Sequence, residues 1–426
     1  MLTSLYTAIT GMNANGTWLS VIGDNVANMN TVGFKSSRVS FGDVLAGVVG
    51  SLQVGRGVLI SGISPLFTQG SFETTSSALD LSIDGDSFFI VNESGARYYT
   101  RAGQFSIDKD GYIVNPDGLI LQGYLADSSG SITGTLGDLQ IGGSQSLANA
   151  TTDATIKLNL DSTADIQTSA FTLDGNGDGV DDDPANYNFS NTITVYDSQG
   201  GDHQITLYFV KTDVNTWDVH YVYTDPDDSS LLVDAGTQEL TFNTSGGLID
   251  DNSGTSISFD FGSAVSSPQD ITFDYGTGTA ESGSGVDGTT QYASDFGVLL
   301  ISQDGYPAGN LRNVSISEDG VITGVFTNGQ TRSIGQIALA KFSAPDKLSK
   351  LGRNLYAESF DSGQPIVGMA NTAGLGRVLS NSLELSNVDL AEEFVKMISA
   401  QRGFQANSRI ITTTDELLQE LVNLKR

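Results

Sequence analysis

Residues 1–30, MLTSLYTAITGMNANGTWLSVIGDNVANMN, and residues 383–426, LELSNVDLAEEFVKMISAQRGFQANSRIITTTDELLQELVNLKR, decide the fold class, because both ends of the chain carry helical spacing. In the first stretch, apolar and small residues recur at alternating steps of three and four, the spacing of a coiled-coil seam. This stripe predicts a helix that needs a partner helix. Its members are Leu2, Leu5, Ile9, Met12, Gly16, Leu19, Gly23 and Val26.

The C-terminal stretch carries the same kind of stripe. The sequence favours Ser386 or Asn387 as the N-cap of this helix, with acidic residues in the first turns, where they complement the helix dipole. A second apolar stripe begins one residue before the end of the first. This shift is expected because an α-helix has 3.6 residues per turn whereas a heptad repeat has 3.5. The first stripe is Leu390, Phe394, Met397, Gln401, Phe404, Ser408 and Ile411, and the second is Ile410, Thr414, Leu417, Leu421 and Leu424.

Two interpretations of the helical ends stay open on the pattern alone. The ends could form an ordinary hairpin within one chain, or they could interlock with the ends of other copies. Apolar side chains concentrated at chain ends, where proteins usually tolerate disorder, favour assembly. We expect the N-terminal members of a polymerisation seam to pack against its C-terminal members in the assembled state. The predicted seam is Leu2, Leu5, Ile9, Met12, Leu19, Val26, Leu390, Phe394, Met397, Phe404, Ile411, Leu418 and Leu421.

Between the helices, the sequence is typical of strands and turns. Asp84-Gly85 and Asp110-Gly111 separate short apolar runs, which is a strong hairpin signal, and a similar block follows near residues 305–342. We predict a mostly β, multidomain protein with α-helical termini that form a coiled-coil layer. The expected divisions are a helix at 1–30, an extended connector at 31–71, a discontinuous β domain at 72–149 and 298–372, an inserted outer β domain at 150–297, a connector at 373–382 and a helix at 383–426.

The inserted region differs from the rest in charge. Residues 151–290 hold 24 Asp and Glu but only two basic residues, Lys157 and Lys211, which gives −22 of the chain's formal −30. Such a surface faces solvent, and its negative charge discourages copies from joining by their sheet edges.

Composition excludes several classes of protein. A net charge of −30 repels nucleic acid, and the absence of cysteine excludes disulfides and thiolate metal sites. No run of 18 apolar residues predicts a membrane span, and the N-terminus does not resemble a cleavable signal peptide.

Few residues suggest chemistry. Asp174, Asn176 and Asp178 in DGNGDGVDDD match the first half of a calcium loop, but Ala185 stands where the closing Glu belongs, so a solvated acidic turn between Asp174 and Asp183 is the favoured alternative. His203 and His220 lie in alternating strands and are more typical of surface positions than of ligands. We expect no catalytic residue, cofactor or metal.

The segment DNVANMNTVGFKSS at 24–37 closely resembles the signature of bacterial flagellar rod and hook proteins, and residues 386–426 resemble their C-terminal helix. Inner blocks at 67–91, 98–124, 191–222 and 304–342 resemble the hook protein family in particular. The residues that match the signature are Asp24, Asn25, Asn28, Asn30, Thr31, Gly33, Phe34 and Lys35.

This resemblance implies a structural subunit that polymerises into a short curved tube, the hook, which passes torque from rod to filament. It also implies export outside the cell without a cleaved signal, and partners in the distal rod, the hook cap and the hook-filament junction proteins. The alternatives are a distal rod or other axial protein of the same family, and a secreted β-rich binding module. The size of the 150–297 insertion favours the hook.

Overall fold

The computed structural model describes residues 2–45, 55–127, 129–143, 145–252 and 254–424, in two compact units. The first unit comprises residues 1–144, 311–325 and 331–426, and the second comprises residues 145–310 and 326–330. The second unit is larger than the predicted 150–297, because strand β21 (Gly297–Gln303) pairs with β12 (Asp153–Asp161) inside it. Both ends of the chain belong to the first unit.

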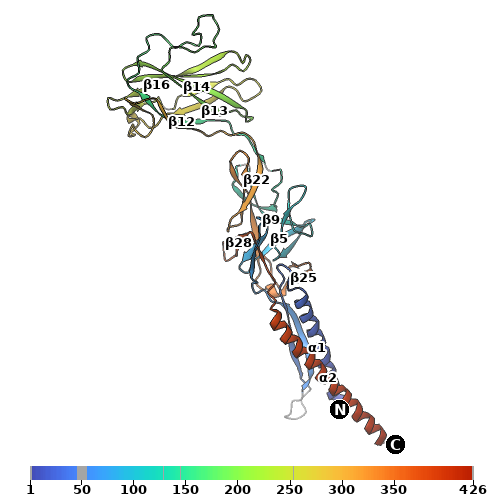
Figure 1. The fold of residues 1–426 in the computed structure, drawn as a ribbon. Helices are drawn as coiled ribbons and strands as arrows, with labels where there is room; N and C mark the ends of the chain where they lie inside the picture. The colour runs from blue at the N-terminus through green and yellow to red at the C-terminus, as the bar shows by residue number, and fades with distance from the viewer. Residues whose placement is uncertain (1, 46–54, 128, 144, 253, 425–426) are drawn as a thin grey trace. The chain divides into compact units, whose positions relative to one another are not determined.

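Helices α1 (Leu2–Ala27) and α2 (Leu390–Leu424) lie side by side in the first unit (Figure 1). The predicted N-cap was wrong. Asp389 caps α2, since its Oδ1 accepts hydrogen bonds from the backbone N–H groups of Ala391 and Glu392, at 2.8 and 3.1 Å. Asn387 is engaged elsewhere, because its Nδ2 donates to the Leu66 carbonyl oxygen at 2.8 Å.

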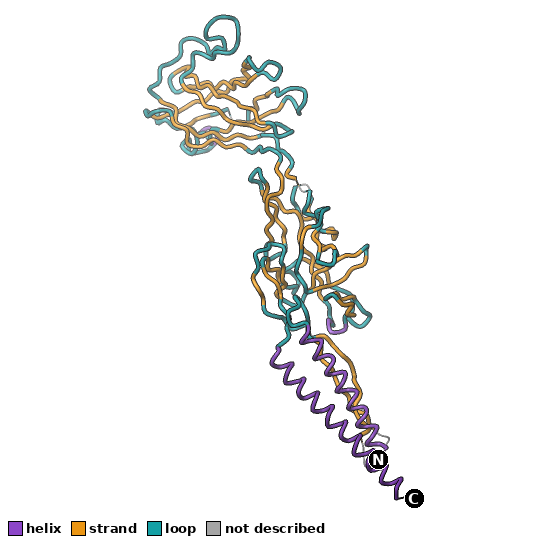
Figure 2. Tube along the Cα trace, turned by 45° about the vertical axis from the view of Figure 1, so that its right-hand side comes forward, coloured by secondary structure: helices purple, strands orange, loops and turns teal. Residues whose placement is uncertain are grey.

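Residues 31–71 contain a β-hairpin, where we predicted an extended connector. Strands β1 (Ser37–Leu45) and β2 (Gly55–Pro65) pair antiparallel, and the hairpin runs beside α1 (Figure 2). The ring centroids of Trp18 on α1 and Phe41 on β1 lie 5.8 Å apart, edge to face.

The β domain of the first unit is built from discontinuous segments. Strand β11 (Gln145–Ser146) pairs with the first two residues of β22 (Gly309–Ile316), and the rest of β22 belongs to the large sheet of the first unit. This sheet continues through β23 (Val321–Phe326), β24 (Thr331–Lys341), β9 (Ile120–Ala126), β5 (Phe88–Glu93), β6 (Ala96–Thr100), β26 (Leu355–Ala357) and β25 (Ser349–Gly352). Strands β10 (Ile132–Asp138), β8 (Ile113–Val114), β7 (Ser106–Ile107) and β27 (Ile366–Met369) extend it.

Two short sheets close the domain toward the helices. Strand β28 (Arg377–Ser380) pairs with β4 (Leu81–Asp84), and β29 (Ser382–Glu384) pairs with β3 (Phe72–Thr74). The connector predicted at 373–382 is therefore partly strand, because Arg377–Ser380 pair with β4 and Ser382 pairs with β3. These pairings carry the chain directly into α2.

The second unit is a sandwich of two sheets around one core. The alternating sequence of β12 buries Ile156, Leu158 and Leu160 completely, as a half-buried strand should. One sheet holds β18 (Ser256–Phe259), β19 (Gln269–Asp274), β12, β20 (Thr290–Tyr292) and β21. The other holds β13 (Phe189–Tyr196), β14 (Asp202–Asp213), β15 (Thr216–Thr224), β16 (Leu232–Phe242) and β17 (Leu248–Asp250).

The predicted fold class, mostly β with α-helical termini, is confirmed. Among the residues that the structure describes, neither helix combines the length and the hydropathy needed to span a membrane.

Candidate assembly surface

Small residues form the contact between α1 and α2. A Cβ atom on Gly11 would lie 2.8 Å from Asn407 Nδ2, and one on Gly403 would lie 2.8 Å from Asn15 Oδ1. Each asparagine also donates to the carbonyl oxygen one turn earlier on its own helix, Asn15 to Gly11 at 2.7 Å and Asn407 to Gly403 at 2.9 Å. The two Gly–Asn contacts are reciprocal and let the helix backbones approach closely. The buried small residues are Ala8, Gly11, Ala14 and Ala400.

The predicted seam lies beside this contact and not inside it. On α1 the buried Ala8, Gly11, Ile22 and Asn25 each fall one residue before a position of the predicted stripe. The described seam residues of both helices are only half-buried, except Phe394 and Phe404, which are exposed. The side chains of Leu2 and Leu421 lie outside the described residues. The seam is thus not the main contact within one chain, and its role between copies stays a prediction. The half-buried residues are Leu5, Ile9, Met12, Leu19, Val26, Leu390, Met397, Ile411 and Leu418.

Because small residues fill the contact within the chain, large apolar side chains are left on the outside of the helix pair. These exposed groups cost free energy in water and are typical of a surface that another molecule covers. They are Tyr6, Phe394, Val395, Ile398, Phe404, Ile410 and Leu417, each between 40% and 66% exposed.

The signature segment fastens α1 to the rest of the first unit. Asn25 is 2% exposed; its Oδ1 accepts from the Ser37 N–H at 2.8 Å, and its Nδ2 donates to the Ser37 carbonyl at 3.0 Å and to Glu393 Oε2 at 3.2 Å. It therefore joins α1, β1 and α2. Asn28 bridges within the turn that follows, where Asn28 Nδ2 donates to Asp24 Oδ1 and Thr31 Oγ1 donates to Asn28 Oδ1, each at 3.1 Å.

The backbone conformation and close packing at Gly33 explain why the signature has glycine at this position. Its φ is +69°, and a Cβ atom there would lie 2.5 Å from the backbone nitrogen of Ala102. Next to it, the buried Phe34 ring lies 4.7 Å from Lys350 Nζ. Asn30 is exposed, and the structure gives it no contact that would explain the match.

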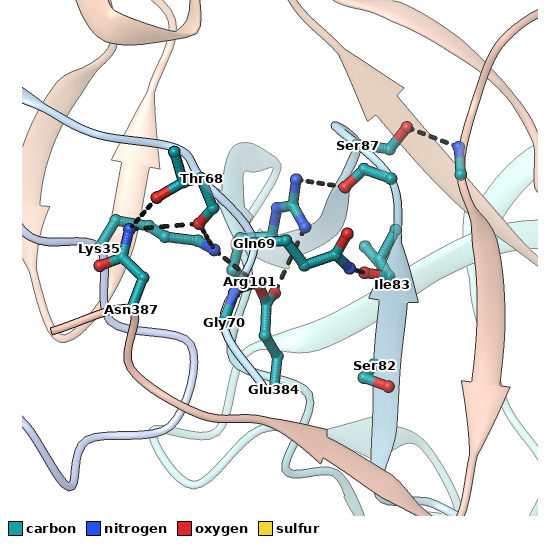
Figure 3. Close-up of polar contacts among 12 residues, drawn as sticks. Lys35, Thr68, Gln69, Gly70, Ser82, Ile83, Ser87, Arg101, Glu384 and Asn387 are labelled. Carbon is teal, nitrogen blue, oxygen red and sulfur yellow. Dashed lines mark hydrogen bonds and ion pairs between the residues drawn. The ribbon is translucent and has the colours of Figure 1, made fainter. Parts of the chain in front are cut away.

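Lys35 belongs to a buried charge cluster in which Glu384 pairs with both Lys35 and Arg101 (Figure 3). The Nζ of Lys35 lies 2.6 Å from Glu384 Oε1 and 2.7 Å from the Thr68 carbonyl oxygen. Arg101 Nη1 lies 3.3 Å from Glu384 Oε2, and its Nη2 donates to the Gly85 carbonyl at 2.6 Å. The side chains of Lys35 and Glu384 are 0% exposed and that of Arg101 is 1% exposed. We call these three residues the charge cluster.

The charge cluster joins the segment after α1, the β domain and the strand before α2. Burial lowers the pKa of Lys35 and of Arg101, and the Glu384 carboxylate opposes both shifts. Glu384 Oε1 also accepts from the Gly70 N–H at 2.9 Å. A buried charge of this kind is tolerated only because it is paired. The sequence marked Lys35 through the signature, but for Glu384 it offered only a glutamate between Leu383 and Leu385.

The other sequence candidates take part in local structure. Asp174 Oδ1 accepts from the Gly177 and Asp178 N–H groups at 2.7 and 3.1 Å, so that carboxylate serves the turn; binding of calcium there stays a prediction. His203 Nε2 lies 2.9 Å from Asp197, and His220 Nδ1 lies 2.7 Å from Asp234 Oδ2.

Four family models match the chain. They describe a flagella basal body rod protein at residues 5–35, a flagellar hook protein FlgE/F/G D1 domain at 82–178, a flagellar basal body protein FlaE D2 domain at 159–306, and a flagellar basal body rod FlgEFG protein C-terminal region at 379–424. The flagellar hook protein FlgE of Escherichia coli K12 is 36% identical over 98% of this chain and 99% of its own length. The chain belongs to the flagellar hook protein family. It is a structural subunit of the flagellar hook.

Other hook proteins agree over the same length. The hook protein of Borreliella burgdorferi is 36% identical, and the match covers 100% of this chain and 100% of that protein. That of Salmonella typhimurium is 35% identical over 98% of this chain and 99% of its own. The relationship of this hook protein to its relatives therefore spans both helices and both units, which confirms the family predicted from the terminal motifs.

Proposed function

We propose that this hook subunit assembles through the apolar surface that α1 and α2 leave exposed, and that it catalyses no reaction. The observation that carries the proposal is the pairing of a small-residue contact inside the helix pair with large apolar residues outside it. A contact between different faces of identical subunits repeats without closing and gives an open helical polymer. The buried charges pair with one another and serve packing, which agrees with a structural role.

The polymer formed in this way is a curved, flexible tube that transmits torque from the rod to the filament. Helices interlocked between copies supply cohesion, while the β units can shift against their neighbours as the tube bends. Membership of the hook family supports the location in the hook outside the cell, export without a cleaved signal, and contacts with the distal rod, the hook cap and the hook-filament junction proteins.

Electron microscopy of the purified chain under polymerising salt tests the assembly surface. We expect the full chain to form tubes and a version without residues 1–30 and 387–426 to stay monomeric. The finer test is a variant with Phe394→Ser and Ile398→Ser, which removes apolar surface without touching the small-residue contact. It should melt like the unmodified chain but fail to form tubes.

Val214→Ser is the matched control, because Val214 is 69% exposed in the second unit and belongs to no helix. Tubes from the Phe394/Ile398 variant as abundant as those from the control would refute the proposed surface. Straight tubes from the unmodified chain would contradict the proposed curved tube and would favour a rod-like polymer.

A further inference from the structure

Strand β21 presents an unusual apolar edge in the acidic second unit. Val298, Leu299 and Leu300 are 44%, 69% and 45% exposed. The strand is nevertheless fixed at both ends, because Phe296 and Ile301 pack against the core of the unit. Among the described residues, β12 is the strand that pairs with β21, so the opposite edge of β21 is open. Rigid, exposed apolar surface of this kind marks a contact site.

The charge around this strand is also exceptional. Residues 145–310 contain two basic residues, Lys157 and Lys211, and no charge falls between Asp295 and Asp304. Lys211 is 6% exposed, and its Nζ donates to the Ser162 carbonyl at 2.6 Å. Lys157 is half-buried, pairs with Leu300 in the sheet register, and donates from its Nζ to the Asp287 carbonyl oxygen at 2.7 Å, which leaves its charge to be balanced by a carboxylate. The cation of this unit that solvent can reach therefore stands directly beside the apolar edge.

We propose that Lys157 and the exposed edge of β21 bind the acidic loop 174–183 of a second copy of this chain. The proposal rests on the hook-subunit function, because the polymer holds copies of the second unit near one another. An acidic surface repels its own copies least where it is uncharged or basic, and this edge is uncharged and lies beside a lysine. The partner must then combine carboxylates with an apolar tip.

Loop 174–183 has that combination. It carries five aspartates, and Val180 among them is 38% exposed. Its turn is held in shape, since Asp174 Oδ2 accepts from the Gly179 N–H at 3.0 Å and Asp178 Oδ1 accepts from the Val180 N–H at 2.9 Å. Strand and loop are different surfaces, so their contact is heterologous and can repeat from copy to copy along an open polymer.

Cysteine crosslinking tests this contact cleanly, because the chain has no cysteine of its own. Tubes of the full chain carrying Leu299→Cys and Val180→Cys are treated with a mild oxidant and run on a non-reducing gel. We expect a ladder of covalent oligomers. Leu299→Cys with Val214→Cys is the matched control and should remain monomeric, although Val214 is 69% exposed and Val180 only 38% exposed in the same unit.

The charge requirement is tested in the same background. Adding Lys157→Glu should abolish the ladder, and adding Lys157→Arg should keep it, while both variants still sediment as tubes. A ladder that survives Lys157→Glu, or dimers formed by Leu299→Cys alone, would overturn the proposal. Tubes without any ladder also overturn it but leave the hook function intact, whereas failure of the unmodified chain to form tubes would contradict the assembly itself.

Discussion

Replacing Glu384 with glutamine measures how much the charge cluster stabilises the first unit. Glutamine keeps the shape of the side chain but removes the carboxylate that pairs directly with both buried cations, Lys35 and Arg101. Breaking a buried ion pair by removing one partner costs about 3–5 kcal/mol. Both cations keep a carbonyl partner, on Thr68 and Gly85, so we expect the loss to be about 4 kcal/mol and not larger.

Differential scanning calorimetry of the full chain measures this loss of stability as a lower unfolding temperature of the first unit. For a unit of this size the transition of the first unit should fall by about 8–16 °C, while that of the second unit stays in place. The matched control is Glu318→Gln, because Glu318 pairs with Arg377 at 3.2 Å on the surface, where its side chain is 63% exposed. Exposed pairs contribute at most about 1 kcal/mol. Equal shifts in the two variants would refute the stabilising role of the cluster.

The same variant has a characteristic pH dependence. Burial lowers the pKa of Lys35 in the folded chain, and removal of the Glu384 carboxylate takes away a group that raises it. As the pH rises from this lowered pKa toward the ordinary lysine value, folded Lys35 has lost its proton while unfolded Lys35 still holds one. The free energy of unfolding therefore rises with pH in that window, and the deficit of Glu384→Gln should shrink in alkaline buffer.

Three further predictions concern single residues. Gly33→Ala should destabilise the first unit by about 2–4 kcal/mol, and Gly118→Ala by only about 1 kcal/mol, because both have a positive φ but only Gly33 adds a clash with backbone; denaturant melts check this, and equal losses would exclude the clash. Burial raises the pKa of Asp251, so the stabilisation of the second unit by Asp251→Asn should be small in acid and grow as the pH rises through that raised pKa, whereas a constant difference in thermal melts would contradict it. Asp389→Ala should cost about 1 kcal/mol and speed amide exchange in the first turn of α2, and unchanged exchange there would exclude Asp389 as the cap.

The sequence predicted the kind of each element better than its contacts. Terminal helices followed from periodicity, and the alternating strands of the second unit followed from apolar residues at every other position, as in β12. The predicted contact between the two helices was in the wrong place because the prediction was based on large apolar residues. In the structure the helices instead touch at Gly11, Gly403 and their asparagine partners, where the backbones can approach closely. Periodicity cannot distinguish a face buried within one chain from a face exposed for another.

The charge cluster was beyond sequence reasoning for a different reason. Lys35 and Glu384 are 349 residues apart, and only the pairing of β29 with β3 brings them together. The signature motif pointed to Lys35 through family resemblance, yet its partner carried no motif. Asn25 was found in the same way, while its contacts with β1 and α2 depend on tertiary structure.

Because Glu384 lies late in the sequence, the first unit can form its buried charge cluster only after most of the chain is present. A chain that stops anywhere before this residue lacks the carboxylate that pairs directly with Lys35 and Arg101, so burying the two cations is less favourable. It also lacks β29 and all of α2, and α1 has no partner for Gly11 and Asn15. We therefore expect a chain that stops before Glu384 to leave its first segment unordered and to offer no paired helices to a growing polymer.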